Sequence, residues 1–191
     1  MPLSPVTKLY SVQDCKISPL LTDPAAGAAT YGDPIDVPGI QTMAISGSME
    51  TKVLRGDNMK LASNSALTDV SVQVTHAKLS VAVLAAILGG ASTAAGTTPT
   101  QTLTWDLSSD DATLPPFKLE GITPPNGVDI IGGDLHWILH KCSLSAFPDL
   151  GFAQEDFRVV SFTAAADPLI STGKWITAVL HETYTAIDDG S

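Results

Sequence analysis

Cysteine is scarce in this chain, and long apolar runs are missing. The 191 residues contain only two cysteines, Cys15 and Cys142, far apart in the sequence. Sparse, distant thiols argue against a disulfide framework and favour a reducing cytoplasm. No stretch of about 18 apolar residues is present, so no membrane-spanning helix is expected. The first five residues also lack the basic start and apolar core of a signal peptide. We therefore expect a chain made in the cytoplasm that does not bind membranes.

Basic residues are also few. Ten Lys and Arg stand against twenty Asp and Glu, which gives a net charge of −10, and the bases are spread from Lys8 to Lys174. Nucleic-acid binding relies on clustered Lys and Arg that contact phosphates, so the chain is not expected to bind DNA or RNA. An acidic surface serves solubility in most proteins, but it also suits a wall past which DNA moves without sticking. Charge alone leaves both readings open.

The motifs of common enzyme and cofactor classes are absent. The sequence has no phosphate-binding loop, no dinucleotide fingerprint, no Gly-x-Ser-x-Gly elbow and no acidic series of a calcium loop. The pairs Asp110-Asp111 and Asp188-Asp189 therefore favour solvated loops. We expect no catalytic residue, no cofactor and no metal, and hence no enzyme.

One group of residues invites a metal interpretation. His136, His140 and Cys142 have even spacing, which places them on one face of a regular strand. At a rise of about 3.3 Å per residue, the two histidines stand roughly 13 Å apart, too far to share one metal. His140 and Cys142 alone do not make a site. We therefore expect this face to pack in the core, with the histidines near its edge.

Alternating polar and apolar residues indicate a mainly β protein. The clearest case is residues 69–76, where Val70, Val72 and Val74 alternate with polar residues. Short strands with regular turn signals predict two packed antiparallel sheets, a sandwich or a barrel. The other predicted strands are residues 40–49, 52–55, 102–107, 117–122, 134–147, 157–165 and 174–186, with 91–101 and 108–111 as loops.

A single short flanking helix is predicted at about residues 80–88. Ser80 can cap its N-terminus, and Gly89 can end it in a left-handed conformation. The segment is uncharged and apolar all round, which indicates cover on both sides, by the chain's own sheet and by a neighbouring subunit. Ala82 and Ala86, four residues apart, form a smooth face and are the predicted subunit contact.

The chain reads as one domain spanning residues 1–191. Its composition, 44% hydrophobic and 16% charged, is typical of a globular protein. Residues 1–36 include a stretch rich in Pro, Gly and Ala and are predicted to form a flexible N-terminal arm. Residues 188–191 are predicted to be a short polar tail.

Several stretches occur in a familiar order along most of the chain. They are Tyr31-Gly32-Asp33-Pro34-Ile35-Asp36-Val37-Pro38-Gly39-Ile40, residues 50–54, Gly56-Asp57-Asn58, the strand and helix of residues 70–90, Phe117-Lys118-Leu119-Glu120-Gly121, residues 135–142 and Ala153-Gln154-Glu155-Asp156-Phe157. This order resembles the major tail tube proteins of long-tailed, siphovirus-type bacteriophages. The resemblance implies a structural virion protein with two packed sheets and a flanking helix. Its homohexameric rings stack into the viral tail tube.

The resemblance also implies partners and a route for DNA. The tube assembles in the host cytoplasm around a tape measure protein and joins tail terminator and tail tip proteins. During genome ejection, DNA passes through the lumen without specific binding, because acidic walls repel its backbone. Asp57, Asp110 and Asp111 are the candidate lumen or rim acids.

Two other functions stay open. One is a β-sandwich module that binds a ligand such as a sugar, with Trp105, Trp137 or Trp175 in its site. The other is a head–tail completion or tail terminator protein, which forms one ring but no tube.

Overall fold

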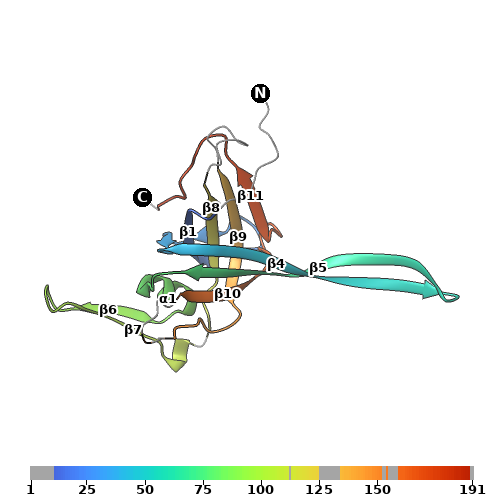
Figure 1. The fold of residues 1–191 in the computed structure, drawn as a ribbon. Helices are drawn as coiled ribbons and strands as arrows, with labels where there is room; N and C mark the ends of the chain where they lie inside the picture. Colours follow the sequence, from blue (N-terminus) through green and yellow to red (C-terminus); the bar gives the residue numbers. More distant parts are fainter. Residues whose placement is uncertain (1–10, 112, 125–133, 152–153, 155–158, 190–191) are drawn as a thin grey trace.

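The computed structural model describes residues 11–111, 113–124, 134–151, 154 and 159–189. These residues form a mainly β protein with two antiparallel sheets and one short helix, which confirms the predicted fold class (Figure 1). The elements are β1 (Asp14–Thr22), β2 (Thr30–Tyr31), β3 (Ile35–Asp36), β4 (Ile40–Gly56), β5 (Met59–His76), α1 (Val81–Leu88), β6 (Ala91–Ala95), β7 (Thr102–Asp106), the 3-10 turn η1 (Ser109–Asp111), β8 (Phe117–Thr123), β9 (Leu135–Leu144), β10 (Val160–Ala166) and β11 (Ile176–Leu180).

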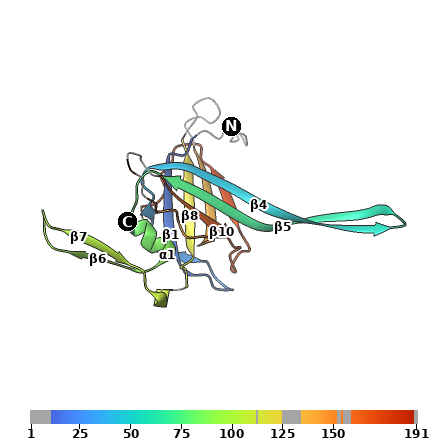
Figure 2. The same ribbon diagram turned by 60° about the horizontal axis from the view of Figure 1, so that its bottom comes forward.

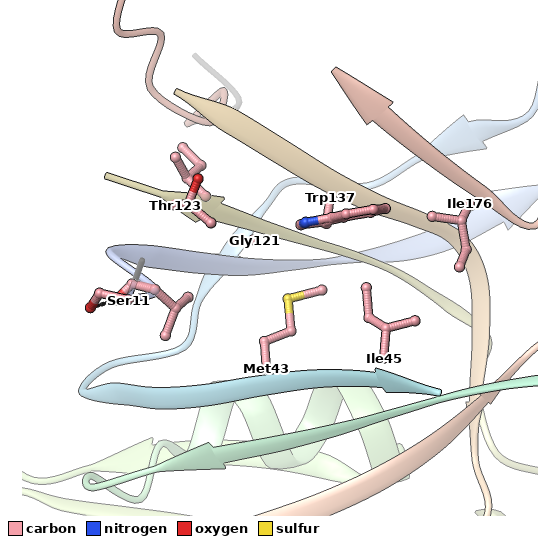
Figure 3. Close-up of a pocket in the computed structure, with 9 residues that line it drawn as sticks. Ser11, Met43, Ile45, Gly121, Thr123, Trp137 and Ile176 are labelled. Carbon is pink, nitrogen blue, oxygen red and sulfur yellow. Dashed lines mark hydrogen bonds between the residues drawn. The ribbon is translucent and has the colours of Figure 1, made fainter. Parts of the chain in front are cut away.

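The larger sheet has nine strands and divides at β9. Its main order is β2-β1-β8-β9-β10-β5-β4, with β3 paired to β1. Two strands pair with β9 on the edge that faces away from β8. The first half of β9 pairs with β11, as Leu139 does with Ile176, and the end of β9 pairs with β10, as Cys142 does with Ala166. The sheet thereby folds so that β4 faces β9 and β11 (Figure 3). Two parts of one sheet make the packed layers, and the second sheet is the separate β6–β7 ribbon.

The core lies between these two parts of the large sheet. Val70, Val72 and Val74 on β5 are each at most 3% exposed, which confirms the predicted apolar face of this strand. Val74 pairs with Phe162 of β10, and the Phe162 ring meets Phe117 of β8 edge-on, with 6.4 Å between the ring centres. Burial of this apolar face stabilises the fold by about 25 cal/mol for each Å² removed from water.

The helix α1 covers one end of this core beside β1 (Figure 2). The Ser80 hydroxyl accepts a hydrogen bond from the Val83 amide at 3.4 Å, so the predicted N-cap is confirmed. Gly89 ends the helix with a positive φ of 80°, but its ψ of −152° differs from the predicted left-handed helical conformation. The helix end is followed directly by β6, and the Trp105 indole N–H of β7 donates to the Gly89 carbonyl at 3.0 Å.

The prediction of an arm over residues 1–36 is wrong for its second half. Residues 14–22 form β1, which pairs with β8 and lies inside the large sheet, and Cys15 and Ile17 are fully buried there. The strands β2 and β3 return along β1. The Pro, Gly and Ala residues of this region therefore shape tight returns between strands instead of a free arm. Residues 1–10 lie outside the described residues.

The predicted strands of residues 40–49, 52–55 and 69–76 belong to one long hairpin. β4 and β5 run continuously for 17 and 18 residues and are joined at Asp57 and Asn58. Both turn residues have positive φ, 49° and 63°, as a two-residue I′ hairpin turn requires. The sequence pattern predicts separate strands here because the outer half of the hairpin buries neither face, so polar and apolar residues do not alternate along it.

Two further boundaries differ from expectation. Residues 91–95 were predicted as a loop but form β6, whose small uncharged residues gave no strand signal. The predicted strand of residues 174–186 ends early, because β11 stops at Leu180 and residues 181–189 continue without strand pairing. Of the predicted tail, Asp188 and Asp189 are exposed, and residues 190–191 lie outside the described residues.

Candidate interaction surfaces

The outer half of the β4–β5 hairpin, residues 46–69, is a ribbon that leaves the body of the protein (Figure 1). Every one of these residues is exposed except Gly56, which is half-buried. Six large apolar side chains stand in solvent there, 41–74% exposed: Met49, Val53, Leu54, Met59, Leu61 and Leu67. Soluble monomers rarely display apolar side chains at this density, so the ribbon is a candidate interaction surface.

The outer end of this ribbon, residues 51–68, carries a local excess of positive charge, although Glu50 and Asp69 bring the whole ribbon of residues 46–69 to three bases and three acids. Between residues 51 and 68 the chain has Lys52, Arg55 and Lys60 but only one acid, Asp57, although the whole chain has a charge of −10. Arg55 and Lys60 pair directly across the two strands, where like charges repel. The expectation that the bases are spread without clustering is therefore wrong at this end of the hairpin. An acidic partner surface would relieve the repulsion.

The β6–β7 hairpin is a second ribbon, which projects from the opposite side of the body (Figure 2). Residues 91–104 are all exposed, and no charged residue occurs from Ala91 to Trp105. Its base is fixed closely to the helix end: a Cβ atom on Gly90 would lie 2.4 Å from the Asp106 carbonyl oxygen. Within the described residues β6 and β7 pair only with each other, so both outer edges are open to another strand.

The predicted subunit contact on α1 is not the smooth outer face that the spacing suggested. Ala86 is only 6% exposed and belongs to the protein's own core, whereas Ala82 is exposed. Five of the eight helix residues are buried within this single chain. The chain's own sheet and strands therefore cover the side of α1 that carries Ala86, and only Ala82 stays available to a neighbour.

The three candidate lumen or rim acids do not come together. Asp57 is exposed at the turn that ends the β4–β5 ribbon. Asp110 and Asp111 lie in η1, which follows β7 on the other side of the body (Figure 1). One wall of a tube contains both places only if different subunits contribute them.

A cavity of about 500 Å³ lies between the two parts of the large sheet (Figure 3). Met43 and Ile45 of β4 point toward Trp137 of β9 and Ile176 of β11. Gly121 of β8 leaves the room that Met43 occupies, because a Cβ atom there would lie 2.4 Å from the Met43 sulfur. None of the nine lining residues is titratable, so the cavity suits an apolar group and offers no acid, base or metal ligand.

The tryptophans predicted for a sugar site are dispersed. Trp137 lines the cavity, Trp105 is half-buried at the base of the β6–β7 ribbon, and Trp175 packs against the core. No face gathers two of them with polar partners among the residues described.

A bulge in β9 separates the residues expected on one strand face. Leu119 of β8 pairs with Leu139, but Phe117, two residues earlier, pairs with Cys142, three residues later. The extra residue turns Cys142 toward the core, onto the face opposite His136. His140 bonds the Thr177 hydroxyl oxygen at 2.6 Å, and burial together with Lys174 and Lys118 lowers the pKa of its ring.

His136 lies in a buried polar cluster that the sequence analysis missed. Its ring contacts carboxylates of Asp134, just before β9, and Glu120 of β8, each at 2.9 Å. Glu120 faces His136 because the neighbouring pairs Ile122–His136 and Glu120–Ile138 place them on one side of the sheet. The cluster lacks a nucleophile in the described contacts, and no described group of three or more His, Cys, Asp or Glu residues is arranged to hold a metal ion.

The two cysteines are free, in agreement with the expected absence of a disulfide framework, and both are buried. Burial raises the pKa of the Cys142 thiol to about 12 and also raises that of Cys15 above its usual range. Both thiols therefore stay protonated and behave as small apolar groups.

No protein-family model matches the chain, and no curated protein matches it. Among the described residues, no helix has the length and apolar character needed to cross a bilayer.

Proposed function

We propose that this chain is the structural subunit of a bacteriophage tail tube, in which hexameric rings stack and DNA passes through the lumen. The observation that carries the proposal is the β4–β5 ribbon of residues 46–69. A two-stranded ribbon exposed on both faces is marginal by itself in water. Its six exposed apolar side chains and open edges are stabilised when another protein surface covers them.

Charge supports a second copy of this chain as that surface. The outer end of the ribbon, residues 51–68, has three bases, Lys52, Arg55 and Lys60, against one acid, and the rest of the chain is acidic. Opposite potentials steer association and fix its orientation. A subunit thus carries both halves of a complementary contact.

The placement of the ribbons supports a ring or a tube over a simple dimer. The β4–β5 and β6–β7 ribbons leave opposite sides of the body (Figure 1). A projecting ribbon that docks on a different surface of the next copy makes a head-to-tail contact. Repetition of such a contact closes a ring or continues as a filament.

The remaining parts of the proposal rest on the resemblance of the sequence to tail tube proteins. They are the number of six subunits, the location in the virion tail, assembly around a tape measure protein, and contact with tail terminator and tail tip proteins. The acidic composition supports a lumen that repels the DNA backbone.

The test is assembly of the purified full-length chain as a function of concentration. Sedimentation velocity follows the mass, and electron microscopy of the same samples shows its form. We expect a shift from monomer to open-ended tubes as concentration rises. A chain that stays monomeric at every concentration and ionic strength refutes the proposal, and isolated rings without tubes favour a terminator or completion protein.

The apolar cavity favours one other function, a module that binds an apolar ligand. This function predicts a monomer whose Trp137 emission changes as an apolar probe fills the cavity. Replacement of Gly121 by Ala brings a methyl group against Met43 and should weaken such binding. Probe binding by a chain that never assembles would support this function over the tail tube.

A further inference from the structure

The polar cluster around His136 holds the end of the described chain. Both nitrogens of the His136 ring face oxygen atoms: Nδ1 lies 2.9 Å from Glu120 Oε1, and Nε2 lies 2.9 Å from both Asp134 Oδ2 and the Thr185 carbonyl oxygen. The three side chains are buried, with Asp134 only 1% exposed and His136 4%. Such a cluster lies outside the main apolar core and outside both ribbons.

Only the doubly protonated ring satisfies this geometry. A neutral imidazole carries one N–H, so its other nitrogen would present a lone pair to an ionised carboxylate or a carbonyl oxygen, and these only accept hydrogen bonds. In a buried setting, such an unmatched contact is costly because water does not screen it. The pKa of His136 agrees: burial alone would lower it, but the bonds to Glu120, Asp134 and Thr185 outweigh burial and raise it.

The same groups fix residues 181–189 to the sheet. Asp134 Oδ2 accepts from the Thr185 amide at 3.3 Å while His136 donates to the Thr185 carbonyl, so both backbone groups of one residue are held. The His181 amide donates to the Asp134 carbonyl at 2.9 Å. Further along, Lys16 of β1 donates to the Ile187 carbonyl at 3.2 Å and pairs with Asp189.

We propose that residues 181–189 form a C-terminal strap that protonated His136 clasps to the sheet and that loosens around Thr185 when the ring loses its proton. When that happens, the ring keeps a single N–H: if it stays on Nδ1 toward Glu120, the Thr185 carbonyl loses its donor, and in either tautomer Asp134 and Glu120 lose the counter-charge of the ring. The strap then remains attached through Lys16 and through the His181 and Thr185 amides, which donate to Asp134. We therefore expect more frequent local opening at residues 181–186, where the charge-assisted contact is weakened, while the contact at Ile187 persists.

The charged groups around the ring fix the direction of the pH effect. Glu120 and Lys118 approach from β8, where they form an ion pair at 3.3 Å. Asp134 precedes β9, and Val179, the β11 residue opposite His136, is uncharged. From the strap itself, the His181 ring stacks at a tilt with 4.6 Å between ring centres, and Asp189 pairs with Lys16 of β1 to form the second attachment.

The folded pKa of His136 is raised, so its contribution to the clasp is complete below the ordinary histidine pKa near 6.5. It is lost as pH rises through the raised value. The hydrogen bond to Asp189 raises the pKa of Lys16, so the second attachment keeps its charge across this range.

Hydrogen exchange read by mass spectrometry tests the clasp on the full-length chain at pH 5.5, 7.0 and 8.5. Rates are corrected for the intrinsic pH dependence of exchange, at a concentration where sedimentation shows one species. We expect protection of the Thr185 amide to fall about 10-fold from pH 5.5 to 8.5, as loss of one charge-assisted hydrogen bond implies. Protection of the Ala164 amide in β10 should not change.

Two variants identify the responsible ring. His136→Gln is uncharged at every pH and should make Thr185 protection independent of pH. His140→Gln removes a ring that bonds Thr177 instead of the strap, and it should keep the wild-type pH dependence. A wild-type chain with equal protection at all three pH values, or His136→Gln with an unchanged pH dependence, overturns the proposal.

A measurement on the unmodified protein keeps the test decisive if His136→Gln fails to fold. The ring resonances of His136 should titrate above the pKa of free histidine and in step with the loss of Thr185 protection. A His136 pKa at or below that of free histidine overturns the clasp. Because these readouts concern one subunit, they stand or fall separately from tube assembly.

Discussion

Leu54 offers the sharpest test of the β4–β5 ribbon as an assembly surface. Its side chain is 63% exposed near the end of the ribbon, so replacement by Ser removes little that stabilises the monomer. Full burial of a leucine contributes about 1.5–3 kcal/mol, so covering this exposed part contributes about 1–2 kcal/mol for each subunit added. At 1.4 kcal/mol per tenfold change, Leu54→Ser should raise the critical concentration for assembly roughly 5- to 30-fold.

Ile170 supplies a matched control. It is also 63% exposed, but it lies in the loop after β10, outside both ribbons. Pelleting of assembled protein over a dilution series gives the critical concentration for wild type, Leu54→Ser and Ile170→Ser. Urea unfolding of each monomer checks that stability is unchanged within about 0.5 kcal/mol. Equal critical concentrations for all three proteins would show that the ribbon around Leu54 stays in solvent, and the reasoning would fail.

Three further experiments test the orientation of α1, the charge of the β4–β5 ribbon and the base of the β6–β7 ribbon. Ala86→Glu places a charge in the core and should lower the free energy of unfolding in urea by about 3–5 kcal/mol. Ala82→Glu, on the exposed side, should change that free energy by less than about 0.5 kcal/mol. Equal effects of the two substitutions would contradict the described orientation of α1. The double change of Arg55 and Lys60 to Glu should leave the monomer folded but abolish pelleting at low salt. Normal pelleting of this variant would show that these charges do not contribute to the contact between subunits. Gly90→Ala brings a methyl group against a backbone carbonyl at positive φ and should cost more than about 1 kcal/mol in thermal unfolding; an unchanged melting temperature would mean that the ribbon base is loose.

The sequence predicted the fold best where burial imposes a pattern. The Val70, Val72 and Val74 face, the Ser80 cap and the mainly β class all follow from residues whose surroundings lie within this chain. The ribbons were missed or broken for the complementary reason. Residues 46–69 and 91–104 face water on both sides in the subunit, so no alternation of polar and apolar residues distinguishes their strands.

The cluster around His136 was missed because it depends on pairing between distant strands. The residues near His136 in the sequence do not predict its contacts with Glu120 of β8 or with the Thr185 carbonyl. The β9 bulge also reversed the face assigned to Cys142, and a single inserted residue leaves no mark on spacing. Helix spacing likewise predicted one shared side for Ala82 and Ala86, but it could not show that Ala86 packs in the core while Ala82 stays exposed. These features can be recognised only when the strand register and the tertiary contacts are known.

The exposed ribbon and the acidic body suggest how a subunit built this way remains soluble and still assembles. A net charge of −10 keeps copies apart through long-range repulsion. Local positive charge at Lys52, Arg55 and Lys60 attracts one end of a ribbon to an acidic body, and the apolar side chains beside it are covered only after that approach. On the proposed function, acidity therefore gives the contact its direction, in addition to solubility and an inner wall that does not bind DNA. Such a contact weakens as salt screens the charges, over a distance of about 10 Å at 0.1 M, whereas a purely apolar ribbon contact would not.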